Sequence, residues 1–253
     1  MLLVSDVHGA SGALARVAAS GEPLLILGDL INFIDYRDNS GILSDVVGQA
    51  FTDDLVRLRT AGEYAAASAL WGRYTGGRER EVRAGFDAAV TDAYEEIVDA
   101  IAGAEVYVTY GNVDRPDLMR EILHAPNRFV DTEVIEIDGQ RIGIAGGGMR
   151  ALGTPGEVSE EQMAAKLSQL GPVDILCTHV PPAIPALARD VVGGQTKSFR
   201  SVLDYIEEHQ PRFHYFGDIH QPQAVAWTIG RTQCRNVGYF RATGRPYRHD
   251  PDI

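Results

Sequence analysis

Side chains that can bind divalent metal ions recur along the chain in short motifs. The motifs are D-x-H, G-D, G-N-x-D, a single H and G-x-x-H, and their polar residues are Asp6, His8, Asp29, Asn112, Asp114, His179, Asp218 and His220. Carboxylate and amide oxygens suit hard cations, and imidazole suits transition metals such as iron. Each motif alone is typical of a surface turn, an Asx turn or a helix cap. Their recurrence in series predicts a metal site.

Short apolar runs precede the motifs and predict the strands that position them. These runs are residues 1–4, 24–27, 106–110, 173–177 and 213–216. In an open α/β sheet, ligand groups collect at the carboxyl ends of several strands. Residues 1–32 have the pattern of a strand, a turn, a helix over 9–19 and a second strand, which is a βαβ unit and implies a parallel sheet. We therefore expect the polar side chains to meet at one sheet edge.

Taken in this order, the motifs from Asp6 to His220 resemble the signature of the calcineurin-like metallophosphoesterases. The resemblance implies an α/β fold, a β-sandwich of two mixed sheets flanked by helices in four αββα layers. It also implies two metal ions, one held by Asp6, His8, Asp29 and His220 and one by Asp29, Asn112, His179 and Asp218. Asp29 would bridge them, as carboxylates do in two-metal hydrolases. We expect Mn²⁺ and/or iron, with Mg²⁺ as an alternative.

The implied function is hydrolysis of a phosphodiester, or of a phosphomonoester, by a hydroxide bound to two metal ions. Asp29 and Asn112 would be catalytic, and Asp114 would orient a ligand histidine. Asn112, Arg115 and His214 are the predicted substrate contacts. The sequence contains no G-x-S-x-G motif and no reactive-cysteine signature, so we expect no side-chain nucleophile.

Two positions depart from the family pattern. Asp218 stands where the family usually has histidine, and a carboxylate there favours Mn²⁺, Mg²⁺ or iron. It also removes one positive charge from the site, from which we expect a preference for monoanionic diesters over dianionic monoesters. Val113 stands where many relatives have a histidine that helps the leaving group. Since valine has no proton to donate, His214 or water would have to do so.

Composition limits the class of protein. The chain has 253 residues and a net charge of −12, which opposes general binding to nucleic acid or to anionic membranes. Cys177 and Cys234 are the only cysteines and form no C-x-x-C pair. A cytoplasmic location fits, because we find neither a signal peptide nor an apolar run of ~20 residues.

The remaining segments predict one domain over residues 1–253, with a helical insertion or cap at residues 33–83. Helices are expected around 55–59 and over 64–74, 84–101, 160–170 and 199–209, and strands over 134–137, 141–145, 225–229, 232–237 and the tail from 239. Asp138-Gly139 predicts a hairpin turn. The glycine run 146–148 is not a dinucleotide fingerprint, because we expect no helix before Ser159, which begins a capping box.

Two functional classes follow from the sequence. The favoured one is an enzyme that acts on a small phosphorylated substrate. The alternative is a non-catalytic or weakly catalytic metal-binding module, which would use residues 33–83 to contact another protein. All seven predicted ligand positions hold a side chain that can bind metal, which favours the enzyme. We also consider a homodimer.

Overall fold

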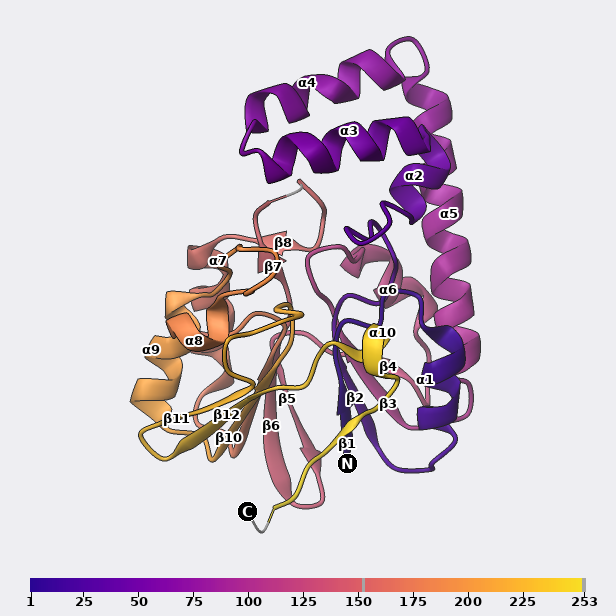
Figure 1. The fold of residues 1–253 in the computed structure, drawn as a ribbon. Coiled ribbons are helices and arrows are strands. Elements are labelled where there is room, and N and C mark those ends of the chain that lie inside the picture. Colours follow the sequence, from indigo (N-terminus) through magenta and orange to yellow (C-terminus); the bar gives the residue numbers. More distant parts are fainter. Residues whose placement is uncertain (152, 252–253) are drawn as a thin grey trace. The chain divides into compact units, whose positions relative to one another are not determined.

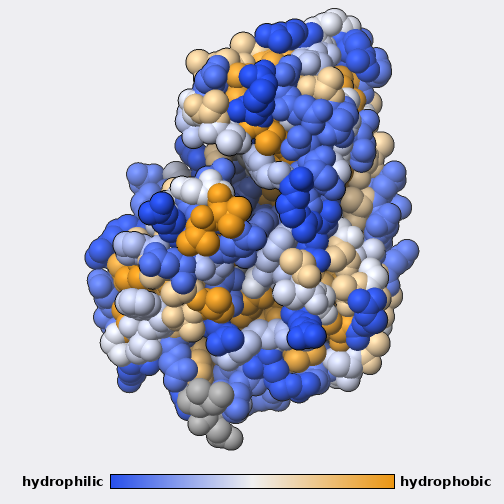
Figure 2. All heavy atoms as spheres, viewed as in Figure 1, coloured by the Kyte–Doolittle hydropathy of each residue, from blue (hydrophilic) through white to orange (hydrophobic). Residues whose placement is uncertain are grey.

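The computed structural model describes residues 1–151 and 153–251, which form two compact units. The first unit contains Met1–Leu30 and the chain from Ile97 onward, and the second contains Ile31–Glu96. All the predicted site residues belong to the first unit. Figure 2 shows polar side chains over most of one face, with apolar side chains gathered in a few places.

A five-stranded sheet in the first unit begins with the predicted βαβ element. Its strand order is β13 (Tyr247–Arg248), β1 (Leu2–Val4), β2 (Leu24–Leu27), β3 (Val106–Thr109) and β4 (Arg128–Phe129). The strands from β1 to β4 are parallel, and β13 pairs antiparallel with β1. Every residue of β1 and β2 is buried, as expected for parallel strands covered on both faces.

A six-stranded mixed sheet completes the sandwich. Its strand order is β11 (Ala226–Ile229), β12 (Thr232–Asn236), β10 (Phe213–Phe216), β9 (Ile175–Thr178), β6 (Gln140–Ala145) and β5 (Glu133–Ile137). The predicted hairpin joins β5 and β6 antiparallel. Its turn residues have φ of 52° at Asp138 and 74° at Gly139, as a two-residue turn of type I′ requires. β7 (Gly148–Met149) and β8 (Glu157–Val158) form a separate short pair.

The two sheets face each other across an apolar core. Leu3 and Leu25 of the first sheet lie in one buried cluster with Ile142, Ile175 and Tyr215 of the second. A second core packs the six-stranded sheet against helices, as Figure 1 shows for α7 (Glu160–Leu170) and α9 (Arg200–His209). The predicted α/β sandwich of two mixed sheets flanked by helices is confirmed.

The other helices of this unit are short. They are α1 (Ser11–Ala18), α6 (Pro116–Ile122), α8 (Pro185–Ala188) and α10 (Phe240–Thr243). The long helix α7 begins after Ser159, whose hydroxyl accepts from the backbone N–H of Gln162 in the predicted capping box.

The tail was predicted as strand, and this is wrong in part. Residues Phe240–Thr243 form α10, and only Tyr247–Arg248 form a strand. That strand joins the first sheet beside β1, not the second sheet. The backbone N–H groups of Phe240 and Arg241 donate to the carbonyls of Ser5 and Asp6, so the tail lies against the turn that follows β1.

The second unit is helical. It contains α2 (Ile42–Val47), α3 (Gln49–Thr60), α4 (Tyr64–Thr75) and most of α5 (Glu79–Ala100). Its core includes Phe51 and Leu70, with Trp71 packed edge-on to Phe51 at a ring distance of 5.9 Å. The insertion predicted at residues 33–83 falls in this unit, and its role as a cap stays a prediction. None of the helices that the structure describes is long and apolar enough to cross a bilayer.

Candidate metal centre

The predicted ligands follow the carboxyl ends of five strands drawn from both sheets. Asp6 and His8 follow β1, Asp29 follows β2, Asn112 and Asp114 follow β3, His179 follows β9, and Asp218 and His220 follow β10. All of these residues are buried except His220, which is partly exposed. Eight polar side chains are therefore gathered in a region where apolar residues would otherwise be expected.

The backbone of four of these residues is left-handed. Asp6, His8, Asp29 and Asp218 have φ of 59°, 42°, 53° and 64°. Residues other than glycine rarely adopt positive φ, and clusters of such residues occur at functional sites. Hydrogen bonds between the turns hold them: the N–H of His8 donates to the Asp29 carbonyl at 2.9 Å, and the N–H of Asp218 donates to Asp6 Oδ1 at 3.1 Å.

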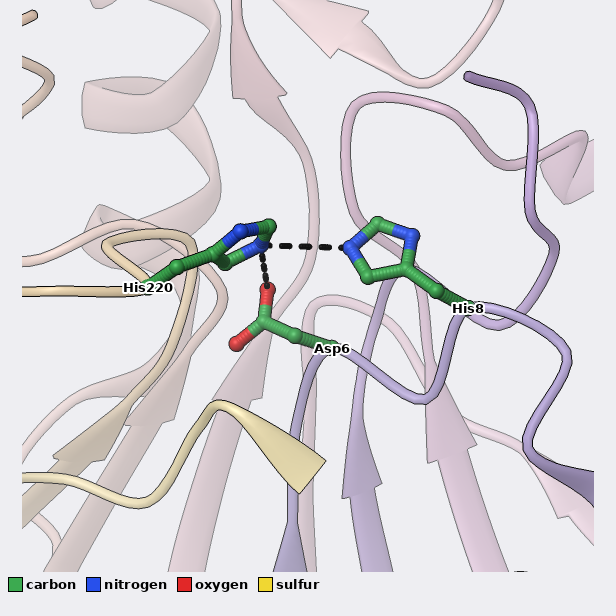
Figure 3. Close-up of side chains that lie close together, drawn as sticks. All are labelled: Asp6, His8 and His220. Atoms are coloured by element: carbon green, nitrogen blue, oxygen red, sulfur yellow. Dashed lines mark hydrogen bonds and ion pairs between the residues drawn. The ribbon is translucent and has the colours of Figure 1, made fainter. Parts of the chain in front are cut away.

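A first group of ligand atoms comes from Asp6, His8 and His220 (Figure 3). The Nε2 atoms of His8 and His220 lie 3.2 Å apart, and His220 Nε2 lies 3.7 Å from Asp6 Oδ1. Asp29 Oδ2 is close by, 3.7 Å from His8 Nε2. These are the four residues that the family resemblance assigns to one metal ion.

The family resemblance assigns Asp29, Asn112, His179 and Asp218 to a second metal ion, and the structure brings ligand atoms of Asp29 and His179 together with one of Asp6. His179 Nε2 lies 3.5 Å from Asp29 Oδ1 and 3.8 Å from Asp218 Oδ1. Asn112 Oδ1, His179 Nε2 and Asp218 Oδ2 are buried and have no hydrogen-bond partner among the residues that the structure describes. Leaving a buried polar atom without a partner costs about 1–3 kcal/mol. A divalent cation held between His179 and Asp218 would supply a partner to both of these side chains, so the residues present fit a metal ion.

The charges of the site favour a bound cation as well. Burial opposes protonation of His179, but the negative charges of Asp29 and Asp218 outweigh it and raise the pKa of His179 to about 10. For Asp29, burial favours the neutral acid, yet His179 and His8 outweigh it and hold the pKa of that carboxyl below its usual range. The cluster thus attracts positive charge, which protons supply when no metal ion does.

Asp114 positions the backbone of two ligand turns. Its carboxylate accepts hydrogen bonds from the N–H groups of Asp29 at 2.7 Å, Gly111 at 2.9 Å and Leu30 at 3.0 Å. Burial, together with the charge of Asp29, raises the pKa of Asp114 to about 6. We expected Asp114 to orient a ligand histidine. For His179 that contact is made by Leu27 instead, since His179 Nδ1 donates to the Leu27 carbonyl at 2.8 Å.

The two other predicted substrate contacts lie outside the ligand cluster. Arg115 Nη2 pairs with Asp117 Oδ2 at 2.8 Å at the start of α6. His214 is fully buried, and its Nε2 is 2.9 Å from Thr178 Oγ1. Its ring stacks on Phe216, a member of the core between the second sheet and the helices. The structure does not bring His214 to the metal ligands, and its role in binding substrate stays a prediction that this position does not favour.

Three residues of the site gave no signal in the sequence. Lys197 donates to Asp218 Oδ1 from a loop that carries none of the motifs. The ring of Tyr239 stacks on that of His220 at 3.9 Å with an interplanar angle of 2°, and Arg241 donates to the His8 carbonyl. A lone lysine in a loop and two residues of an irregular tail have no periodicity that could have revealed them.

Lys197 also changes the charge balance on which the expected diester preference depended. Asp218 in place of histidine removes one positive charge from the site, and the expected preference followed from that loss. The ammonium group of Lys197 restores that charge beside Asp218. Burial opposes the charged form of Lys197, but Asp218 outweighs it and raises the lysine pKa. The charge of the site therefore gives no reason to prefer diesters over monoesters.

Comparisons with known proteins bear on the family and the fold. A family model described as calcineurin-like phosphoesterase matches residues 1–222. No curated protein matches the chain. The crystal structure of TT1561 of Thermus thermophilus is similar with a TM-score of 0.50 at 12% identity, covering 97% of this chain and 96% of that one. Another crystal structure has a TM-score of 0.59 at 15% identity, covering 94% and 90% of the two chains. At such identities the likeness concerns the fold alone.

Proposed function

The chain belongs to the calcineurin-like phosphoesterase family, and we propose that it hydrolyses a phosphodiester or phosphomonoester bond of a small substrate at a binuclear metal site. The observation that carries this proposal is the set of three buried, unpartnered ligand atoms, on Asn112, His179 and Asp218, beside the separate group of Asp6, His8 and His220. The carboxylate of Asp29 lies between the groups, with Oδ1 toward His179 and Oδ2 toward His8.

Divalent cations bound by these residues, Mn²⁺ and/or iron in our proposal, would lower the pKa of water and neutralise charge on the phosphoryl oxygens. The chain contributes rigid placement of the ligands, through the carboxylate of Asp114 and the carbonyl of Leu27. Asn112 offers a neutral oxygen, which would bind a cation without adding negative charge that would repel the substrate.

The residues of the site offer no competing nucleophile. Cys177 and Cys234 are buried, and burial raises the pKa of both thiols, so neither is a reactive thiolate at neutral pH. Val113 has no proton to give to the leaving group, and His214 is held against Thr178. We therefore assign protonation of the leaving group to water.

The proposal is tested by hydrolysis of bis(p-nitrophenyl) phosphate and p-nitrophenyl phosphate with protein stripped by a chelator, before and after addition of Mn²⁺. Activity is expected to return with metal and to be lost in Asp29→Asn. Asp204→Asn, which alters an exposed carboxylate on α9, is the matched control and should behave as the unchanged protein. Absence of hydrolysis with Mn²⁺ bound would favour the metal-binding module without catalysis.

A further inference from the structure

The ammonium group of Lys197 lies at the metal centre, although no motif includes this residue. Its Nζ donates to Asp218 Oδ1. The Asp218 side chain is only 1% exposed, whereas that of Lys197 is 28% exposed. A buried ligand is thus bonded to a side chain that solvent can partly reach.

The backbone around Lys197 is fixed. Its N–H donates to the Ala188 carbonyl at 3.0 Å, and Phe199, two residues further on, is buried in the core and bridges to Pro182, three residues after His179.

Neighbouring bridges hold the rest of the loop. Arg189 pairs with Thr196, and Asp190 pairs with Pro222, two residues after His220. Lys197 is therefore held in place by the segments that follow two metal ligands.

The ammonium group retains capacity for another partner. It has three N–H donors, and Asp218 is its one hydrogen-bonded acceptor within the part of the chain that the structure describes. A lysine side chain that is partly exposed and has further N–H donors is suited to bind the oxygens of a phosphoryl group, and hydrogen bonds between charged groups are stronger than neutral ones.

Lys197 does not occupy the place of a metal ion. If it did, the ligand atoms that the resemblance assigns to the second metal ion would be directed to it. Instead, Asn112 Oδ1, His179 Nε2 and Asp218 Oδ2 have no partner among the described residues, and the lysine uses only the other oxygen of Asp218. The ammonium group therefore leaves these three ligand atoms to a cation and adds a positive charge of its own beside Asp218.

We propose that Lys197 is a substrate-binding residue, whose ammonium group, held by Asp218, binds the phosphoryl oxygens as a third cation of the site. This inference rests on the proposed function, because it names a contact to the substrate of that reaction. It accounts for Asp218 at a position where a histidine could not hold an ammonium group in the same way.

Binding of inorganic phosphate to Mn²⁺-loaded protein tests the inference without any turnover. Isothermal titration calorimetry should show phosphate affinity about 10- to 100-fold weaker in Lys197→Met, because a hydrogen bond between charged groups is lost. Lys197→Arg, which keeps the charge, should recover most of the affinity. Arg189→Met is the matched control, since it removes an exposed positive charge from the same loop and should leave phosphate binding unchanged.

Metal content measured on the same samples shows whether Lys197 binds phosphate beside the metal ions or takes the place of one of them. Equal numbers of bound ions in the unchanged protein and in Lys197→Met are expected. More ions in the variant would mean that Lys197 takes the place of a metal ion and would overturn the inference, as would unchanged phosphate affinity. If Lys197→Met does not fold, Lys197→Gln provides the same comparison. A different result would contradict the proposed function: the unchanged protein would bind phosphate but hydrolyse no ester.

Discussion

Gly111 is a position where the addition of one methyl group should disturb the metal centre. A Cβ atom built on Gly111 would lie 2.6 Å from His179 Nε2 and closer still to Asp29 Oδ1. Ordinary contacts between non-bonded atoms are about 3.5–4.0 Å. In Gly111→Ala, the two ligand side chains must therefore move by about 1 Å. Such a displacement of catalytic groups costs about 100-fold in rate, and we expect kcat/KM and Mn²⁺ affinity to fall together.

The effect of Gly111→Ala on folding should be smaller than its effect on the site. Overpacking of a buried position costs about 1–3 kcal/mol, and each kcal/mol lowers Tm by about 2–4 °C in a chain of this size. Circular dichroism melts, Mn²⁺ titration calorimetry and hydrolysis of bis(p-nitrophenyl) phosphate measure the three quantities. Gly12→Ala is the control, because a Cβ at Gly12 in α1 meets no atom within 4 Å. Equal Mn²⁺ affinity and rate in the two variants would refute the reasoning.

Other substitutions test the supporting residues. Asp114→Ala leaves three backbone N–H groups without their acceptor, and urea unfolding should show a loss of about 3–5 kcal/mol; a loss under 1 kcal/mol would contradict the role of Asp114. Burial lowers the pKa of His214 to about 3. In the unfolded chain this imidazole takes up a proton near pH 6.5, whereas in the folded chain it stays neutral. The contribution of His214 to the free energy of unfolding is therefore complete above pH 6.5 and falls as the pH drops toward 3. Between pH 7 and 5, protonation of this histidine in the unfolded chain lowers the free energy of unfolding by about 2 kcal/mol. His214→Leu should therefore lose less stability than the unchanged protein over that range, and an equal loss in the two proteins would exclude this explanation. Tyr239→Leu removes the ring stacked on His220, and calorimetry should give Mn²⁺ affinity about 2- to 10-fold weaker; unchanged affinity would mean that the stacking does not position the ligand.

Several strands, turns and helix ends could be predicted from the sequence because the signals for them are local. The run of β2 is apolar at every position, as both faces of a parallel strand are covered. The hairpin of β5 and β6 follows from Asp138-Gly139, whose positive φ values match the turn. The start of α7 follows from the reciprocal hydrogen bonds of Ser159 and Gln162. In each case, neighbouring residues decide the structure.

Contacts between distant segments could not be predicted in this way. Lys197 reaches Asp218 only because the bridges of its loop bring the two segments together. The tail lies beside β1, at the opposite end of the sequence, and no local pattern indicates that pairing. His214 is a different case. Its neighbours Phe213 and Tyr215 face the core of the sandwich, so the alternation of side chains along a strand predicts that His214 faces the helices.

The central claim is that this cluster holds two divalent ions and uses them to hydrolyse phosphoesters. The most direct measurement is a titration of chelated protein with Mn²⁺, in which bound ions per chain and the rate of bis(p-nitrophenyl) phosphate hydrolysis are followed in the same samples. The account predicts no hydrolysis without metal and a rate that rises until about two ions are bound per chain. Hydrolysis that persists in metal-free protein, or full occupancy of the site without hydrolysis, would contradict it.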